Sequence, residues 1–416
     1  MNNINHDNPL PPLRRDLDFS HVKRAGTDYV VISDPLGVVE NTVALSENFF
    51  QLLFTLDGKI SLNDIKVMVR THQQAADEDF TKLFSGIDRI KKIGLLESEE
   101  FFIMKKKLEE KIAADPRRPM LCAGSSYEED PDKFIEQMQE FFATVGKIDQ
   151  PGNANAIIVP HIDFRIGEIA AKTYAAGYRA IQDTNADTFI IFGTSHKVSS
   201  DYFMLSEKDY MTPLGPIETD RDFINDLKEK LSYEPKIDEI AHRLEHSVEF
   251  QAVLLKYFFR NRDIKIVPIL VGSFYEHIIS GTLPETNPKI KEFMEVISAV
   301  ASEKERKTIF ISSVDFSHIG KKFGDDFNAE TMLEMIYEED SILIDSLIAG
   351  DKDSFFEKIS KVEDKWKVCG TAPIYSMLGA AGNKEGRLLQ YSQWNERETF
   401  SAVTFAGIAY YDNMSK

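Results

Sequence analysis

The chain has 416 residues, 43% hydrophobic and 28% charged, which is typical of a globular protein of two or three domains. Its formal net charge of −19 argues against partners such as nucleic acid or an anionic membrane surface, and no apolar run is long enough to span a membrane. With two cysteines, Cys122 and Cys369, and no apolar leader, we expect a protein of the reducing cytoplasm.

The first part of the chain predicts a small separate domain. Residues 1–20, rich in Asn, Pro and charge, predict a flexible arm. Residues 21–100 contain short strand-like stretches followed by amphipathic helices, a winged-helix-like α+β pattern. Residues 101–117 predict a charged helical linker, which the sequence DPRRP ends.

Three roles stay open for residues 21–100. DNA binding is disfavoured because the segment is not basic. The stretch TVALSENFFQLLFTLDGKISLNDI resembles the small PqqD-like domains, related to the pyrroloquinoline-quinone chaperone, which bind peptides by adding a strand. A structural or dimerising role is the third possibility.

From residue 118 to residue 412, strand-like and helical stretches alternate. The strand-like stretches include AIIVPH, TFIIFGTSH, IKIVPILVGS and KTIFISSVDFSH, and the chain closes with two more, LLQYSQW and FSAVTFAGIAYYD. Such alternation predicts an α/β fold, a three-layer sandwich with a mostly parallel central sheet.

Polar side chains follow several of these strands at the point where each one ends. His161, His196, Asp315 and His318 all stand in such positions. A single histidine at a strand end is more often part of a polar turn than a ligand. Because open α/β sheets bind ligands outside the carboxyl ends of their strands, three histidines and an aspartate there predict a common site.

Two other stretches carry candidate chemistry. Cys369, in VCGTAPIY, precedes a predicted helix whose positive N-terminal end should lower the pKa of the thiol, although a buried structural cysteine is also possible. In HRLEHSVEFQ we expect His242 to be a solvated helix start and His246 to face the sheet edge; the HExxH order of a zinc protease is absent. Two imidazoles and one thiolate suit Fe(II), Zn(II) or Cu and leave a coordination position open.

The second part of the chain carries eight motifs in a characteristic order. They are RRPMLCAGSSYEEDPDKF, PHIDFRIG, FGTSH, KDYMTPLGPIETD, LEHSVEFQ, VPILVG, SSVDFSHIG and VCGTAPIYSML. In this order they resemble the Memo family, called AmmeMemoRadiSam system protein B in prokaryotes. The family's fold is similar to that of class III extradiol dioxygenases, which are non-haem iron enzymes.

The resemblance implies a metal site formed by His161, His196 and Cys369, with Fe(II) as the first candidate and Cu or Zn as alternatives. It places Asp315, His318 and His246 around the same pocket as catalytic or supporting groups. A cysteine stands where the dioxygenases have a carboxylate, which argues against ring cleavage.

The sequence departs from commoner Memo forms at two places. PHIDFRIG stands where many members carry PHAGYxYSG, and Lys197 follows His196 where a second histidine is frequent. We therefore expect Asp163 and Arg165, with Ser195, to line the substrate pocket and to favour a charged or polar ligand.

These features together predict a cytoplasmic, mononuclear non-haem iron redox protein or oxidoreductase that acts on a small molecule or a peptide. The alternative is a non-enzymatic binding or accessory protein with a vestigial pocket, which serves a peptide or a radical SAM partner. A metal-free hydrolase that uses Cys369 is a third possibility. The oligomeric state stays open.

Overall fold

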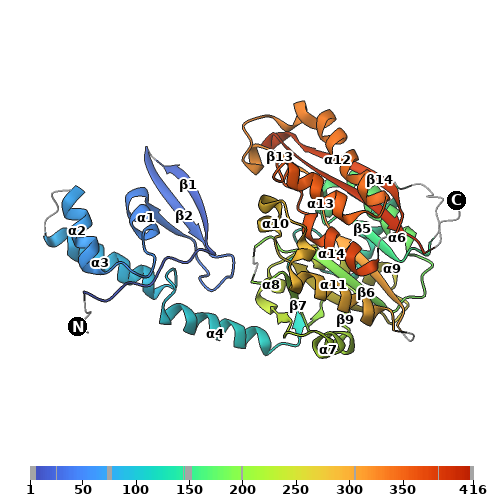
Figure 1. Ribbon diagram of the computed structural model, residues 1–416, viewed down its shortest axis with the longest axis horizontal. Helices are drawn as coiled ribbons and strands as arrows, with labels where there is room; N and C mark the ends of the chain where they lie inside the picture. The colour runs from blue at the N-terminus through green and yellow to red at the C-terminus, as the bar shows by residue number, and fades with distance from the viewer. Residues whose placement is uncertain are drawn as a thin grey trace. The chain divides into compact units, whose positions relative to one another are not determined.

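The chain forms two compact units, residues 1–115 and residues 116–416 (Figure 1). The computed structural model describes residues 6–24, 26–72, 77–143, 145, 152–197, 200–303, 306–382 and 384–412. The finer division predicted from the sequence, with a linker over residues 101–117, stays a prediction.

The first unit combines a small antiparallel sheet with helices. Its strands lie in the order β1 (Asp18–Arg24), β2 (Thr27–Ser33), β3 (Val43–Ser46). Its helices are α1 (Glu47–Phe54), α2 (Leu62–His72), α3 (Asp77–Lys92) and α4 (Glu99–Ala113). The predicted likeness to peptide-binding domains stays a prediction.

The segment expected to be a flexible arm packs onto this unit where the structure describes it. Leu13 and Arg14 are both fully buried. The Arg14 guanidinium donates to the carboxylates of Asp16 and Asp34 and to the carbonyl of Gly94. These contacts hold the segment because a buried guanidinium needs partners for its N–H groups. Residues 1–5 lie outside the described part of the chain.

Within its described residues, the second unit is built on a ten-stranded mixed sheet. Its centre is parallel, in the order β11 (Lys265–Val271), β6 (Thr188–Thr194), β12 (Thr308–Ser313), β5 (Ala156–Val159). Strand β15 (Ser401–Tyr410) runs antiparallel to β5, and β13 (His318–Gly320) and β14 (Gly386–Glu396) run antiparallel to β15. On the other side lie β7 (Phe203–Leu205), β9 (Glu218–Thr219) and β10 (Lys236–Ile237), while β4 (Arg117–Arg118) pairs with β8 (Asp209–Tyr210).

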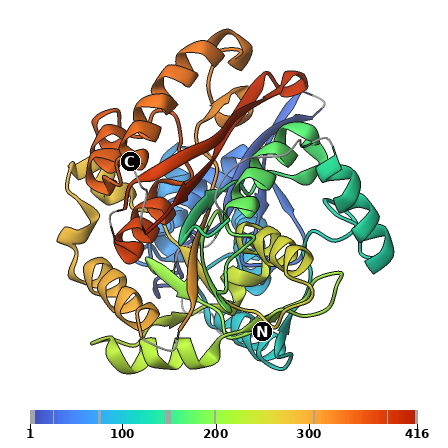
Figure 2. The ribbon, with the colours of Figure 1, turned by 90° about the vertical axis from the view of Figure 1, so that its right-hand side faces the viewer.

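Helices cover both faces of this sheet (Figure 2). Successive strand residues point to opposite faces, so Ile158 joins one apolar core and Ile157 the other. The first core contains α7 (Arg221–Lys230), α10 (Tyr275–Ser280), α11 (Pro288–Ala301), α12 (Leu333–Ile348), α13 (Lys352–Lys361) and α14 (Thr371–Ala381). The second contains α5 (Pro131–Ala143), α6 (Glu168–Ala180), α8 (Glu239–Arg243) and α9 (Ser247–Phe258).

The predicted α/β fold with a central, mostly parallel sheet is confirmed. Parallel pairing includes β10 with β7 and β9 with β11, whereas β7 pairs with β11, and β15 with its neighbours, in the antiparallel direction. None of the described helices combines the length and the apolar character needed to cross a bilayer.

Candidate metal centre

Three neighbouring parallel strands deliver polar side chains to one edge of the sheet. His161, His196 and Asp315 each stand two residues beyond the last residue of β5, β6 and β12. The register pairs Ser313, at the end of β12, with Val159 at the end of β5 and with Gly193, one residue before the end of β6, so the three positions lie within one residue of the same level. The ring centroids of His161 and His196 are 4.9 Å apart. The expectation that these strand ends meet is therefore correct.

His161 is buried and held as a neutral imidazole. Its Nδ1 lies 2.8 Å from the carbonyl oxygen of Ser313. Because a carbonyl only accepts, Nδ1 carries the proton and Nε2 presents a lone pair. Burial lowers the pKa of His161 well below its ordinary value, and the nearby rings of His196 and His246 lower it further. Its Nε2 faces the sulfur of Cys369, 3.6 Å away.

One buried carboxylate orients two more imidazoles. Oε1 of Glu245 lies 2.9 Å from Nδ1 of His196 and 3.1 Å from Nδ1 of His246. The two rings stack, with centroids 5.0 Å apart and planes at 17°. Burial disfavours the charge of Glu245, but the bonds to both histidines outweigh it and hold the pKa of Glu245 well below its usual range. Burial likewise opposes charge on His196, yet the bond to Glu245 raises the pKa of His196.

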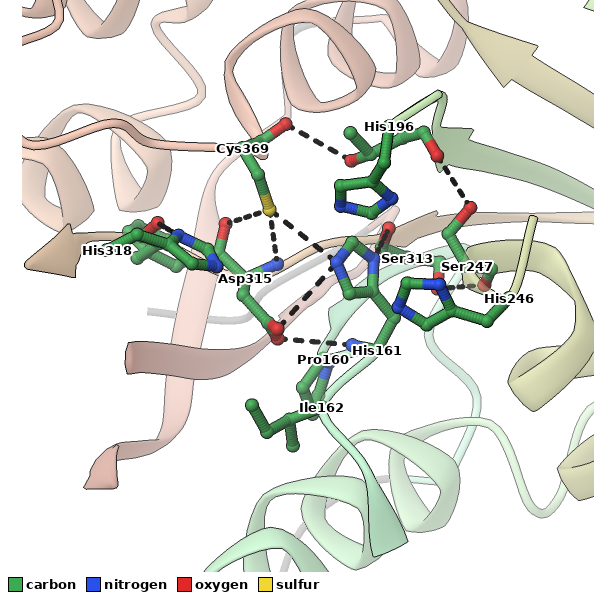
Figure 3. Close-up of polar contacts among 12 residues, drawn as sticks. Pro160, His161, Ile162, His196, His246, Ser247, Ser313, Asp315, His318 and Cys369 are labelled. Atoms are coloured by element: carbon green, nitrogen blue, oxygen red, sulfur yellow. Dashed lines mark hydrogen bonds and ion pairs between the residues drawn. The ribbon is translucent and has the colours of Figure 1, made fainter. Parts of the chain in front are cut away.

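Cys369 lies just before α14, and its side chain points toward the ring of His161 (Figure 3). Its Sγ lies 3.3 Å from the carbonyl oxygen of Asp315 and accepts a hydrogen bond from the Asp315 amide at 3.4 Å. A Cβ on Gly370 would stand 2.9 Å from the same carbonyl, so glycine permits this close approach.

The expected low pKa of the Cys369 thiol is wrong. Burial raises the pKa of Cys369 well above its ordinary value, and the charge of Asp315 adds to this effect. The positive helix end does not outweigh this loss of hydration, although Cys369 as a whole is half-buried.

Among the described residues, the side chains offer two groups of potential metal ligands, each with ligand atoms within 4.8 Å of one another. One is His161, His196 and Cys369, and the other is His196, Glu245 and His246. In the second group, Oε2 of Glu245 accepts a hydrogen bond from the His196 amide, and Oε1 accepts from Nδ1 of both imidazole rings. Because the Glu245 oxygens already have these donors, the first group is the better ligand set.

Asp315 lies against this group and His318 lies beyond it. The Asp315 carboxylate accepts from the amide of His161, and burial raises the pKa of Asp315 to about 7. Nδ1 of His318 donates to the carbonyls of Phe316 and Lys367, and Figure 3 places this ring on the far side of Asp315 from the other histidines. His318 joins neither ligand group among the described residues.

A protein-family model described as "Memo-like protein" matches residues 118–409. The chain belongs to the Memo family. A "MEMO1 family protein" of Aquifex aeolicus (strain VF5) is 29% identical over 389 residues, which covers 92% of this chain and 96% of that protein. A relative of the same description from Thermococcus onnurineus (strain NA1) is 30% identical over 302 residues, 69% of this chain and 97% of its own length. The Aquifex match therefore extends into the first unit of this Memo-family chain.

A cavity of about 200 Å³ opens beside the candidate ligands of this Memo-family protein. Its lining includes Ser195, His196 and Cys369, together with Asp364 and the start of α14. A larger hollow of about 850 Å³ lies at the opposite, amino ends of β6 and β11 and contains none of these residues. The smaller cavity is the candidate substrate pocket because ligands bind at the carboxyl ends of such strands.

The structure does not bring Asp163 and Arg165 to this cavity, where the sequence analysis placed them. Their side chains form an ion pair with each other at 2.6 Å, and Asp163 also accepts from Ser126. Asp163 also caps the short helical turn Phe164–Ile166, which explains its orientation. Only Ser195 of the three expected pocket residues lines the cavity.

Two residues of the HRLEHS stretch differ from expectation in this Memo-family chain. His242 is not solvated but fully buried, with Nε2 2.8 Å from the Met204 carbonyl and Nδ1 2.6 Å from the Tyr210 hydroxyl. Glu245 had no predicted role. In the sequence, Glu245 is marked only by its place next to His246, and an acidic residue beside a histidine is common where neither has a function.

Proposed function

We propose that this Memo-family protein holds one divalent transition-metal ion on His161, His196 and Cys369 and uses it in redox chemistry. One observation carries the proposal: the three ligand atoms lie within 4.8 Å of one another. In addition, the second nitrogen of each imidazole already has a partner, in Ser313 for one ring and Glu245 for the other. Metal-binding histidines need such partners to fix the tautomer and the ring orientation.

The donor set favours Fe(II), with Cu or Zn as alternatives. Two imidazoles and a thiolate form a borderline-soft set, and three protein ligands leave a position for substrate. Iron or copper held there would supply one-electron chemistry. We place this activity in the reducing cytoplasm, where a thiol ligand stays reduced.

The surrounding residues would bind substrate and manage protons. Asp315 has a pKa raised by burial to about 7, and the His246 ring, held through Nδ1 by Glu245, lies beside the site, so both suit proton transfer. His318 holds the carbonyl of Lys367, two residues before Cys369, and so supports the position of the thiol. The cavity beside Ser195, about 200 Å³, suits a small molecule.

Metal analysis of anaerobically purified protein tests the proposal. We expect about one metal ion per wild-type chain and loss of most of it in His161→Ala and Cys369→Ser. Cys122→Ser is the matched control, because Cys122 is the other free cysteine and belongs to neither ligand group. The control should keep the wild-type metal content.

Two results would contradict the proposal. Wild-type metal content in both site variants would show that the metal binds elsewhere. Absence of metal from the wild-type protein after incubation with Fe(II), Cu(I) or Zn(II) would favour the alternative, a binding protein for a peptide or a radical SAM partner.

A further inference from the structure

The turn between α8 and α9 carries Glu245 and His246 and is held in part by its own bonds, since the amides of His246 and Ser247 donate to Oε1 of Glu245. Helix α8 has five residues and ends at Arg243, and α9 begins at Ser247. The carbonyls at the end of a helix lack partners within it. Because the Glu245 carboxylate bonds to amides of its own turn, its position depends also on the groups that hold the main chain of the turn from outside.

A single buried guanidinium binds that main chain at two points. Nε of Arg118 donates to the carbonyl of His242, and Nη2 donates to the carbonyl of Glu245, both at 2.7 Å. Arg118 is 1% exposed, and its guanidinium lies over the ring of Tyr210. The rigid fork of an arginine fixes the spacing of the two carbonyls it joins, which a flexible amine does not do.

Arg118 is itself held by the first turn of α9. Its Nη1 pairs with Oε2 of Glu249 at 2.5 Å, and this carboxylate is fully buried. Oε1 of Glu249 accepts from the Cys122 amide at 2.8 Å and from the Tyr127 hydroxyl at 2.5 Å. The pair thus locks the segment from residue 118 to residue 127 against the turn that carries Glu245.

We propose that Arg118 is a positioning residue of the metal site. By fixing the carbonyls of the turn, it places Glu245 where one carboxylate oxygen meets Nδ1 of both His196 and His246. Arg118 contacts no candidate ligand side chain and acts through Glu245. The expected effect of Arg118 on metal affinity rests on the proposed metal-binding function. Its expected effect on the imidazoles holds in the metal-free protein as well.

The expected size follows from the distance at which Arg118 acts. Loss of a partner bonded directly to a metal-binding histidine typically costs about 10- to 100-fold in metal affinity. Arg118 bonds to no candidate metal-binding histidine and acts through Glu245. We therefore expect its loss to weaken metal binding by about tenfold, the lower end of this range.

The experiment compares Arg118→Met and Arg118→Lys with wild type in two measurements. In the metal-free protein with ¹⁵N-labelled histidine, we expect the Nδ1–H signals of His196 and His246, assigned from their Gln variants, to shift or broaden. In a Co(II) titration, we expect about tenfold weaker binding and a changed absorption spectrum. Arg118→Lys keeps a cation beside Glu249 and so protects the fold, yet should show the same direction of change.

Arg14→Met is the matched control, since Arg14 is also a buried, carboxylate-paired arginine but belongs to the first unit. It should leave both measurements unchanged. Wild-type imidazole signals in both Arg118 variants would overturn the inference. If wild-type protein binds no Co(II), the metal proposal fails, while the imidazole signals still decide the role of Arg118.

Discussion

Asp340 is a buried carboxylate whose replacement should change the pH dependence of stability. It lies on α12 and is fully buried. It accepts hydrogen bonds from the hydroxyls of Ser317, Tyr391 and Thr404. Burial raises the pKa of Asp340 from its ordinary value of 3.8 to about 6, against the effect of these bonds.

The sign and size follow from proton linkage. Between the unfolded and the folded pKa, the native state binds more protons than the unfolded state, so the free energy of unfolding falls as pH rises. A shift of about 2 pKa units corresponds to about 3 kcal/mol in total, of which about 2 kcal/mol lies between about pH 4.5 and about pH 7.5. Because asparagine does not titrate, Asp340→Asn removes this fall in the free energy of unfolding. We therefore expect the variant to gain about 2 kcal/mol relative to wild type over that interval.

Urea unfolding followed by tryptophan fluorescence measures this difference. The chain has two tryptophans, Trp366 and Trp394, and both lie in the second unit with Asp340, so the signal reports that unit alone. Asp345→Asn is the control, because Asp345 is an exposed aspartate on the same helix. A difference between wild type and Asp340→Asn that stays constant with pH would refute the reasoning.

Three further substitutions test the site. Glu245→Gln should weaken metal binding by about 10- to 100-fold in a Co(II) titration, because Gln has one accepting oxygen and cannot accept both from the imidazoles and from the His196 amide, as the two carboxylate oxygens do; wild-type affinity would contradict this. His242→Phe should lower the free energy of unfolding by about 3 kcal/mol, since the Tyr210 hydroxyl and a buried carbonyl lose their partner, while metal content stays unchanged. Gly370→Ala should cost about 1 to 3 kcal/mol, because its Cβ would meet the Asp315 carbonyl, and should also weaken metal binding. Unaltered unfolding curves would contradict the last two predictions.

The sequence predicted the part of the site that depends on strand ends. Uninterrupted apolar runs before His161, His196 and Asp315 mark buried parallel strands, and such strands end at one edge whatever their order. The sequence did not predict the properties that depend on how deeply a side chain is buried in the folded protein. Neither the burial of His242 nor the raised pKa of Cys369 is visible in the local sequence, because both result from segments far away in the chain.

Asp163 and Arg165 illustrate a different limit. They stand only two residues apart, shortly after His161 in the sequence. Each compensates the charge of the other in an ion pair. Pattern alone does not distinguish side chains that pair with each other from side chains that reach a ligand. Glu245 is the opposite case, since its role depends not only on its neighbour His246 but also on His196, which follows β6 and lies far away in the sequence.

The charges of the site explain how a fold can tolerate so many polar groups at a buried sheet edge. Burial lowers the pKa of His161 and raises that of Cys369, so both groups are uncharged at neutral pH. Glu245 stays charged, because its bonds to His196 and His246 outweigh the cost of burying its carboxylate. A metal ion would therefore replace a thiol proton in a site that is already folded and hydrogen-bonded. The preorganisation resides in the main-chain carbonyl of Ser313 and the carboxylate of Glu245, so a substitution of Glu245, which removes a side-chain partner, should alter metal affinity more than it alters stability.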